Sequence, residues 1–76
     1  MNEHDNVVLT VDLPESGLQA EDVGVIVHDY AGGDAVEVEF LALDGSTLSI
    51  ETLTTEQIRP IRPQEIAHAR AVAGTN

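Results

Sequence analysis

The stretch EDVGVIVHDYAGGDAVEVEF (residues 21–40) contains two runs rich in β-branched residues on either side of a pair of glycines. β-Branched residues favour strands, and adjacent glycines accept the positive φ angles of a tight turn. We therefore predict a β-hairpin with strands at 22–30 and 35–43, a turn at 31–34, and a bulge or sharp bend at Gly24. The stretch carries six acidic residues and no lysine or arginine.

Two further strands flank this hairpin. Residues 7–14 and 47–53 alternate apolar and polar side chains with the period of two that is typical of strands. A loop at 44–46 would place Phe40 opposite Ile50 and Glu39 opposite Glu51, and this register gathers apolar side chains on one face. The predicted core is Val7, Leu9, Val11, Val23, Val25, Val27, Val38, Phe40, Leu48 and Ile50.

The last third of the chain predicts a helical turn, a short strand and a helix. Thr54 and Gln57 have the spacing of a capping box, which favours a single helical turn at 54–57. Pro60 confines the strand at 58–61 to a sheet edge. Pro63 suits the first position of a helix, and helix formers follow it up to Gly74, so we expect a helix at 63–73.

This order of elements resembles that of SH3-like barrels, and EDVGVIVHDY resembles the strand start of KOW-related domains. Residues 7–61 resemble a bacterial family, domain of unknown function 4926. The shared residues are Asp12, Leu13, Pro14, Gly17, Leu18, Asp22, Val23, Gly24, Glu37, Val38, Glu39, Phe40, Ile58, Arg59 and Pro60. The chain departs from the family pattern at Glu21, where members tend to carry glycine, and this puts the turn before Asp22 in question.

The pattern and the resemblance together imply a mainly β fold. We expect a small five-stranded SH3-like β-barrel over residues 1–61, followed by a short C-terminal helix and tail over residues 62–76. Because the family has no established chemistry, the resemblance implies no catalytic residue.

The charge of the chain argues against several functions. The 14 acids and three arginines give a net charge of −11, and lysine is absent. Nucleic-acid affinity depends largely on Lys and Arg, so direct binding of DNA or RNA is not expected. The chain has no cysteine, which excludes disulfides and favours a cytoplasmic setting. No signal peptide is expected at the acidic N-terminus, and no apolar run approaches the roughly 20 residues of a membrane span.

No chemical motif emerges from the sequence. His28 is predicted in the middle of a strand with no nucleophile at local spacing, and we interpret it as a surface or half-buried histidine. The sequence lacks the residue patterns that calcium-binding loops and phosphate-binding loops require. Tyr30 and Phe40 are too few aromatics for a proline-binding groove. We therefore expect no enzyme, no catalytic residue, no cofactor and no metal.

The acidic face of the predicted sheet is the remaining candidate site. Glu37, Glu39 and Glu51 would share it with Leu41, and like charges directly opposite each other are destabilising unless a partner meets them. The alternative is a solvated surface that serves solubility or a halophilic setting. We predict a small acidic protein-binding module, an antitoxin or immunity-type partner of a basic protein, that is a monomer or weak homodimer. The competing hypothesis is an acidic mimic of nucleic acid that inhibits a DNA- or RNA-handling protein.

Overall fold

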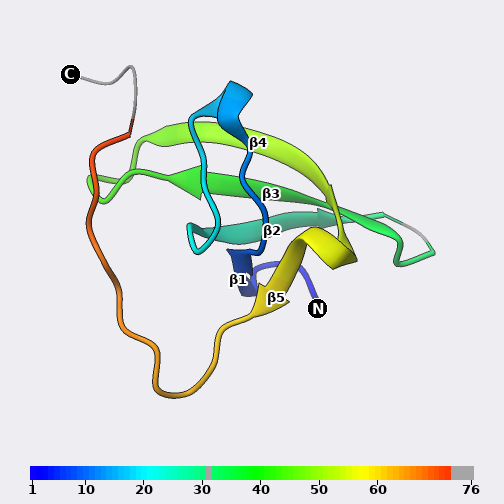
Figure 1. Ribbon diagram of the computed structural model, residues 1–76. Coiled ribbons are helices and arrows are strands. Elements are labelled where there is room, and N and C mark those ends of the chain that lie inside the picture. Colours follow the sequence, from blue (N-terminus) through cyan, green and yellow to red (C-terminus); the bar gives the residue numbers. More distant parts are fainter. Residues whose placement is uncertain (31, 73–76) are drawn as a thin grey trace.

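The chain folds into one antiparallel sheet of five strands in the order β4-β3-β2-β1-β5 (Figure 1). The computed structural model describes residues 1–30 and 32–72. Two single 3-10 turns, η1 (Pro14–Ser16) and η2 (Thr55–Gln57), complete the elements. The strands are β1 (Asn6–Leu9), β2 (Val23–Asp29), β3 (Ala35–Leu41), β4 (Thr47–Thr54) and β5 (Ile58–Pro60). The predicted order of elements up to β5 is confirmed.

The predicted closed barrel is wrong, because the sheet is open. β4 and β5 form its two edges, and no strand pairing joins them within the described residues. β5 has only three residues and ends at Pro60, which has no N–H to donate. This strand pairs with β1 and is too short to build a second ladder.

The turn between β4 and β5 follows from its sequence. The Thr54 N–H donates to Gln57 Oε1 at 2.9 Å, and the Thr54 side chain accepts a bond from the Gln57 N–H. This reciprocal pair is the predicted capping box, and it satisfies donors that a short helical turn leaves free. The capping box is confirmed.

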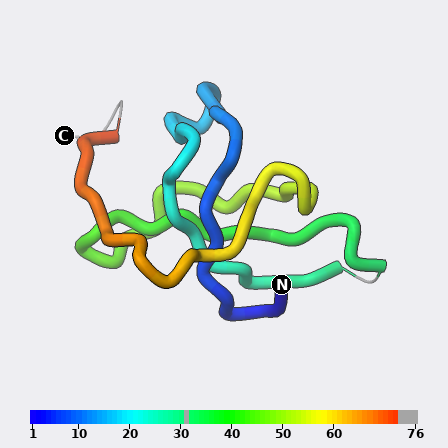
Figure 2. Tube along the Cα trace, turned by 60° about the horizontal axis from the view of Figure 1, so that its bottom comes forward, coloured from blue at the N-terminus to red at the C-terminus, as the bar shows by residue number. Residues whose placement is uncertain are grey.

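The core lies on one side of the sheet, which we call the inner face. The loop at residues 10–22 rises from this side (Figure 2) and places Leu18 in the core, while Leu13 packs against it. Backbone hydrogen bonds between Leu13 and Leu18 narrow the base of that loop. The buried cluster is Val7, Leu9, Leu18, Ile26, Val36, Val38, Phe40, Leu53 and Ile58.

Four of the ten predicted core residues are buried, namely Val7, Leu9, Val38 and Phe40. The opposite set of β2 side chains from the one we predicted faces inward. Gly24 and Ile26 are buried, whereas Val23 is 49% exposed. A continuous β-branched run fits either face equally well, so periodicity alone did not distinguish them. Val11, Val27 and Ile50 are also exposed, and Val25 and Leu48 are half-buried.

Gly24 is required by close packing and does not mark a bulge. A Cβ at this position would lie 2.5 Å from Val38 Cγ1 and 3.0 Å from Phe40 Cε1. The irregularity in the β2–β3 ladder falls between Ile26 and His28 instead.

The register of the β3–β4 hairpin differs by one residue from the prediction. Phe40 pairs with Ser49, and Val38 pairs with Glu51, with a shift between Phe40 and Leu41. The shift inserts Leu48 as an extra residue and turns Ser49 and Glu51 toward the inner face. Polar residues are tolerated there because Glu51 accepts hydrogen bonds from Ser16 and Ser49. The predicted opposition of Glu39 and Glu51 is therefore wrong.

The predicted C-terminal helix is also wrong as far as residue 72. Residues 61–72 contain no helix, and the remaining predicted helix residue, 73, lies outside the described residues, as does the predicted stop at Gly74. A helix of about 11 residues is marginal without docking, and its main apolar side chain, Ile66, is 92% exposed. Among the described residues, none of the helical segments is long or apolar enough to cross a membrane.

Candidate functional site

The outer face is the side of the sheet opposite the core, and it carries most of the predicted partner-binding residues. Strand pairing puts Val25, Glu39 and Ile50 in one row across β2, β3 and β4. His28, Glu37 and Thr52 form the adjacent row. Side chains in such rows are direct neighbours, so acidic and apolar groups alternate across this surface.

The two acids of the outer face accept hydrogen bonds from nearby hydroxyl groups. Thr47 Oγ1 donates to Glu39 Oε2 at 2.5 Å. A hydrogen bond to the Glu37 carboxylate raises the pKa of Tyr30, and burial and the Glu37 charge act in the same direction. Neither hydroxyl group supplies a positive charge to these side chains.

Apolar side chains lie in the solvent beside these acids. Leu41 is 43% exposed, and Ile50 on the neighbouring strand is 55% exposed. Val23, on the β2 side of the same face, is 49% exposed. Single exposed apolar residues are ordinary, but several on one sheet face together with carboxylates make a mixed surface suited to protein contact.

The paired arginines bind acids other than Glu37 and Glu39. Arg59 makes a bidentate ion pair with Glu65, with nitrogen–oxygen distances of 2.9 and 2.6 Å. Arg70 binds Asp22 at the end of the long loop, residues 10–22. Strand pairing puts Arg59 on the same side of the sheet as Val23, but within the described part of the chain no arginine pairs with Glu37 or Glu39.

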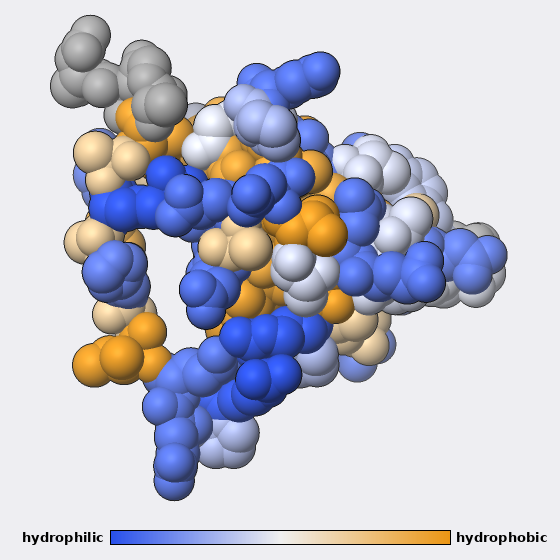
Figure 3. Space-filling view, in the orientation of Figure 1, coloured by the Kyte–Doolittle hydropathy of each residue, from blue (hydrophilic) through white to orange (hydrophobic). Residues whose placement is uncertain are grey.

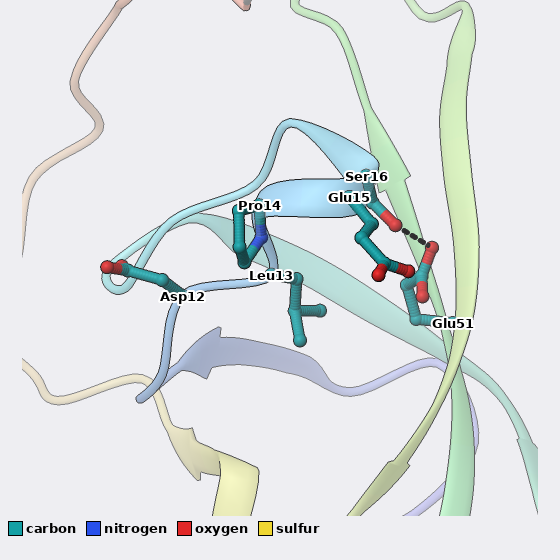
Figure 4. Close-up of a pocket in the computed structure, with 6 residues that line it drawn as sticks. All are labelled: Asp12, Leu13, Pro14, Glu15, Ser16 and Glu51. Carbon is teal, nitrogen blue, oxygen red and sulfur yellow. Dashed lines mark hydrogen bonds between the residues drawn. The ribbon is translucent and has the colours of Figure 1, made fainter.

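Glu51 does not belong to the outer face, although we predicted it there. It lies beneath η1, where the Ser16 hydroxyl donates to Glu51 Oε2 at 2.8 Å (Figure 4). This carboxylate helps to line a pocket of ≈ 230 Å³ together with Asp12, Leu13, Pro14, Glu15 and Ser16. The Asp12 side chain points away from the other labelled side chains. The pocket thus collects negative charge and offers acceptors for hydrogen bonds.

Sequence reasoning missed this arrangement because it depends on the bulge at Leu48. The sequence of β3 did indicate which side chains share a face. Val36, Val38 and Phe40 alternate there with Glu37 and Glu39. This alternation predicts that Glu37, Glu39 and Leu41 lie on one face of the strand, and the structure confirms that they share a face.

His28, which we interpreted as a surface or half-buried histidine, has two side-chain neighbours. His28 is exposed and packs edge-on against Tyr30, with ring centroids 4.6 Å apart. Its Nδ1 lies 4.0 Å from a carboxylate oxygen of Glu3. Among the described residues, no three His, Cys, Asp or Glu side chains stand close enough to hold a metal ion.

Residues 3–60 match the model of a family described as domain of unknown function (DUF4926). This match covers the whole sheet, so the chain belongs to that family. No curated protein and no solved structure matches the chain.

One backbone angle in the loop before β2 is unusual. Glu21, where we noted that members tend to carry glycine, has a φ of 79°. This is a left-handed conformation that glycine adopts freely and other residues adopt at a cost. Glu21 adopts this conformation in the turn before Asp22, and its N–H donates to the Leu9 carbonyl at 2.7 Å.

Proposed function

We propose that this protein is a small non-enzymatic binding module whose outer face docks a basic protein. The observation that supports it best is the strand register, which places Glu37, Glu39 and Leu41 on one exposed sheet face beside Ile50. An antitoxin or immunity-type role, in which the module covers a basic surface of its partner, is the form of this function that we favour.

The electrostatics of the chain identify the kind of partner. The 58 residues that precede Arg59 contain 13 acids and no lysine or arginine. A field of this sign attracts basic proteins and orients them before contact. Arginines of the partner would form charge-assisted hydrogen bonds with Glu37 and Glu39, which lack an internal cation.

The apolar side chains on the outer face favour a shaped protein partner over nucleic-acid mimicry. A mimic acts through the spacing of its charges and gains nothing from exposed Leu41 and Ile50. A protein interface, in contrast, needs an apolar centre that is surrounded by polar groups. The order of the elements is also that of SH3-like domains, and we interpret the open sheet as a variant of that arrangement.

Affinity capture from extracts of the native host, followed by measurement of association rates, tests this function. The test variant is Glu37→Gln with Glu39→Gln. The matched control is Asp34→Asn with Glu56→Gln, which removes the same charge from exposed positions on a turn and on η2. We expect one basic protein to bind wild type and control alike, and to associate about tenfold more slowly with the test variant.

Two results would contradict the proposal. Equal slowing by the test variant and by the control would mean that total charge matters and the face does not, as expected for a mimic. Capture of no basic protein by the wild type would remove the proposed partner.

A third variant, Leu41→Ser, should shorten the lifetime of the complex while leaving the association rate nearly unchanged.

A further inference from the structure

The end of the long loop holds an arginine side chain in a formed site. Arg70 Nε donates to Asp22 Oδ1 at 2.9 Å, and a terminal nitrogen donates to Asp22 Oδ2. The same nitrogen donates to the Gly17 carbonyl oxygen at 3.2 Å. The side chains of Arg70 and Asp22 are 24% and 19% exposed, so much of the pair is removed from solvent.

The loop prepares Asp22 for this role. The Gln19 N–H donates to Asp22 Oδ2 at 2.9 Å, and the Asp22 N–H donates to the Gln19 carbonyl at 3.1 Å. Gly17 takes a left-handed conformation at the end of η1, with φ of 72°. The carboxylate and the carbonyl are therefore fixed by loop bonds that do not involve Arg70.

The ionisation of Asp22 agrees with this geometry. Burial alone would raise the pKa of Asp22, but hydrogen bonds from Arg70 and from the Gln19 N–H, and the Arg70 charge, lower it below its usual value. A planar guanidinium fits two carboxylate oxygens and a carbonyl at once, whereas an ammonium group does not.

The segment that delivers Arg70 is attached to the body at few points. Residues 61–72 have no helix or strand, and open space separates part of the segment from the body of the molecule in Figure 3. Ile66 in the middle of the segment is 92% exposed. The binding site is thus built by the loop, and its occupant comes from an extended and largely exposed chain.

We propose that Asp22 and the Gly17 carbonyl form an arginine-binding site, which Arg70 occupies from within the chain and from which an arginine of a basic partner displaces it. The charge of the first 58 residues, 13 acids without a lysine or arginine, favours a partner of this kind. This site is separate from the outer face, and its test requires no knowledge of the partner of that face.

Arg70 acts as an intramolecular competitor in this arrangement. A short tether gives an effective concentration in the millimolar range, so a single free arginine competes poorly with it. Removing the Arg70 side chain should therefore tighten the binding of an arginine ligand about fivefold, the factor that corresponds to a partly exposed ion pair of about 1 kcal/mol.

The experiment titrates the full chain with a hexa-arginine peptide and, separately, with a hexalysine peptide. Binding is followed by NMR through the backbone amides of Gln19 and Asp22 and the Nε–H of Arg70. The proteins are wild type, Arg70→Ala, and the control Arg62→Ala, which removes one positive charge from the same segment and leaves the site intact. A fourth protein combines Arg70→Ala with Asp22→Asn.

We expect hexa-arginine to bind Arg70→Ala about fivefold more tightly than it binds wild type or Arg62→Ala. In wild type the peptide should move the Arg70 Nε–H signal to its free position. The Asp22→Asn change should abolish the shift at Gln19, and hexalysine should shift it much less.

Equal binding to Arg70→Ala and Arg62→Ala would overturn the proposal, because net charge would then explain the gain. Equal responses to arginine and lysine peptides would overturn it as well, since the site would then not distinguish a guanidinium from an ammonium group. Should the Asp22→Asn protein fail to fold, the comparison of the two peptides on Arg70→Ala still decides the question.

Discussion

The sheet at residues 6–60 and the segment at residues 61–72 are held by different forces. Nine apolar side chains from the strands and the long loop form one buried cluster. No apolar side chain of the segment is fully buried among its described residues, and the ion pairs of Glu65 and Arg70 help to tie it down. Burial of apolar area contributes far more to stability than partly exposed ion pairs do.

This difference means that the two regions should respond to mutation on different scales. Changes in the sheet should act on the global stability of the domain. Changes in the segment should alter local contacts and leave the melting transition nearly unchanged.

The largest effect is expected from Phe40→Ala, because Phe40 is 2% exposed in the centre of the core. We expect a loss of about 3–5 kcal/mol in the free energy of unfolding, which a domain of this size does not easily survive. Ile66→Ala, the matched change in the segment, should leave the urea midpoint unchanged. Similar losses from the two variants would show that the segment is part of the cooperative unit.

Gly24→Ala should have the second largest effect. The added methyl group would lie 2.5 Å from Val38 Cγ1, so β2 and β3 must shift apart, at a cost of about 1–3 kcal/mol. The double variant with Val38→Ala removes the atom closest to the added methyl group, and urea unfolding should then show a loss smaller than the sum of the single losses. Additive losses would contradict the close packing that we describe.

Glu21→Gly should stabilise the protein, because the φ of 79° at this position is strained for glutamate. Relief of a left-handed conformation is worth about 1–2 kcal/mol, and the extra freedom of glycine in the unfolded chain takes back about 0.5–1 kcal/mol. Thermal unfolding should show a net gain of about 0.5–1 kcal/mol. Glu21→Ala keeps the strain while removing the charge, so a gain of the same size in that control would point to charge repulsion instead.

The smallest effect concerns Glu65, and it appears as a pH dependence. Hydrogen bonds from Arg59 and from the Arg62 N–H lower the pKa of Glu65 from 4.5 to about 2. Because the folded pKa is the lower one, the stabilisation from this contact is complete above pH 4.5 and is lost as the pH falls through about 2. Carboxyl NMR should show the pKa of Glu65 returning toward 4.5 in Arg59→Ala, with little change in melting temperature. Retention of the low pKa in that variant would mean that the Arg62 N–H dominates.

The sequence by itself determined the order of the elements, and the reason is that local chemistry specifies them. β-Branched runs and paired glycines specify the hairpin, and Thr54 with Gln57 specifies the turn before the last strand. The alternation of Val36, Val38 and Phe40 with acids also fixed which side of β3 is buried. For this reason Glu37, Glu39 and Leu41 were correctly predicted to lie together.

Only the tertiary structure decided the features that depend on contacts between distant residues. The β4 register needed a bulge at Leu48 and a hydroxyl from Ser16, which lies 35 positions from Glu51 in the sequence. The inward side of β2 depended on the space that Gly24 leaves for Val38 and Phe40. The C-terminal segment had the local signals of a helix, but Arg70 binds Asp22, 48 positions away, and no apolar surface receives Ile66. Helix propensity is worth a few tenths of a kcal/mol per residue, so it does not hold a short segment in a helix without docking.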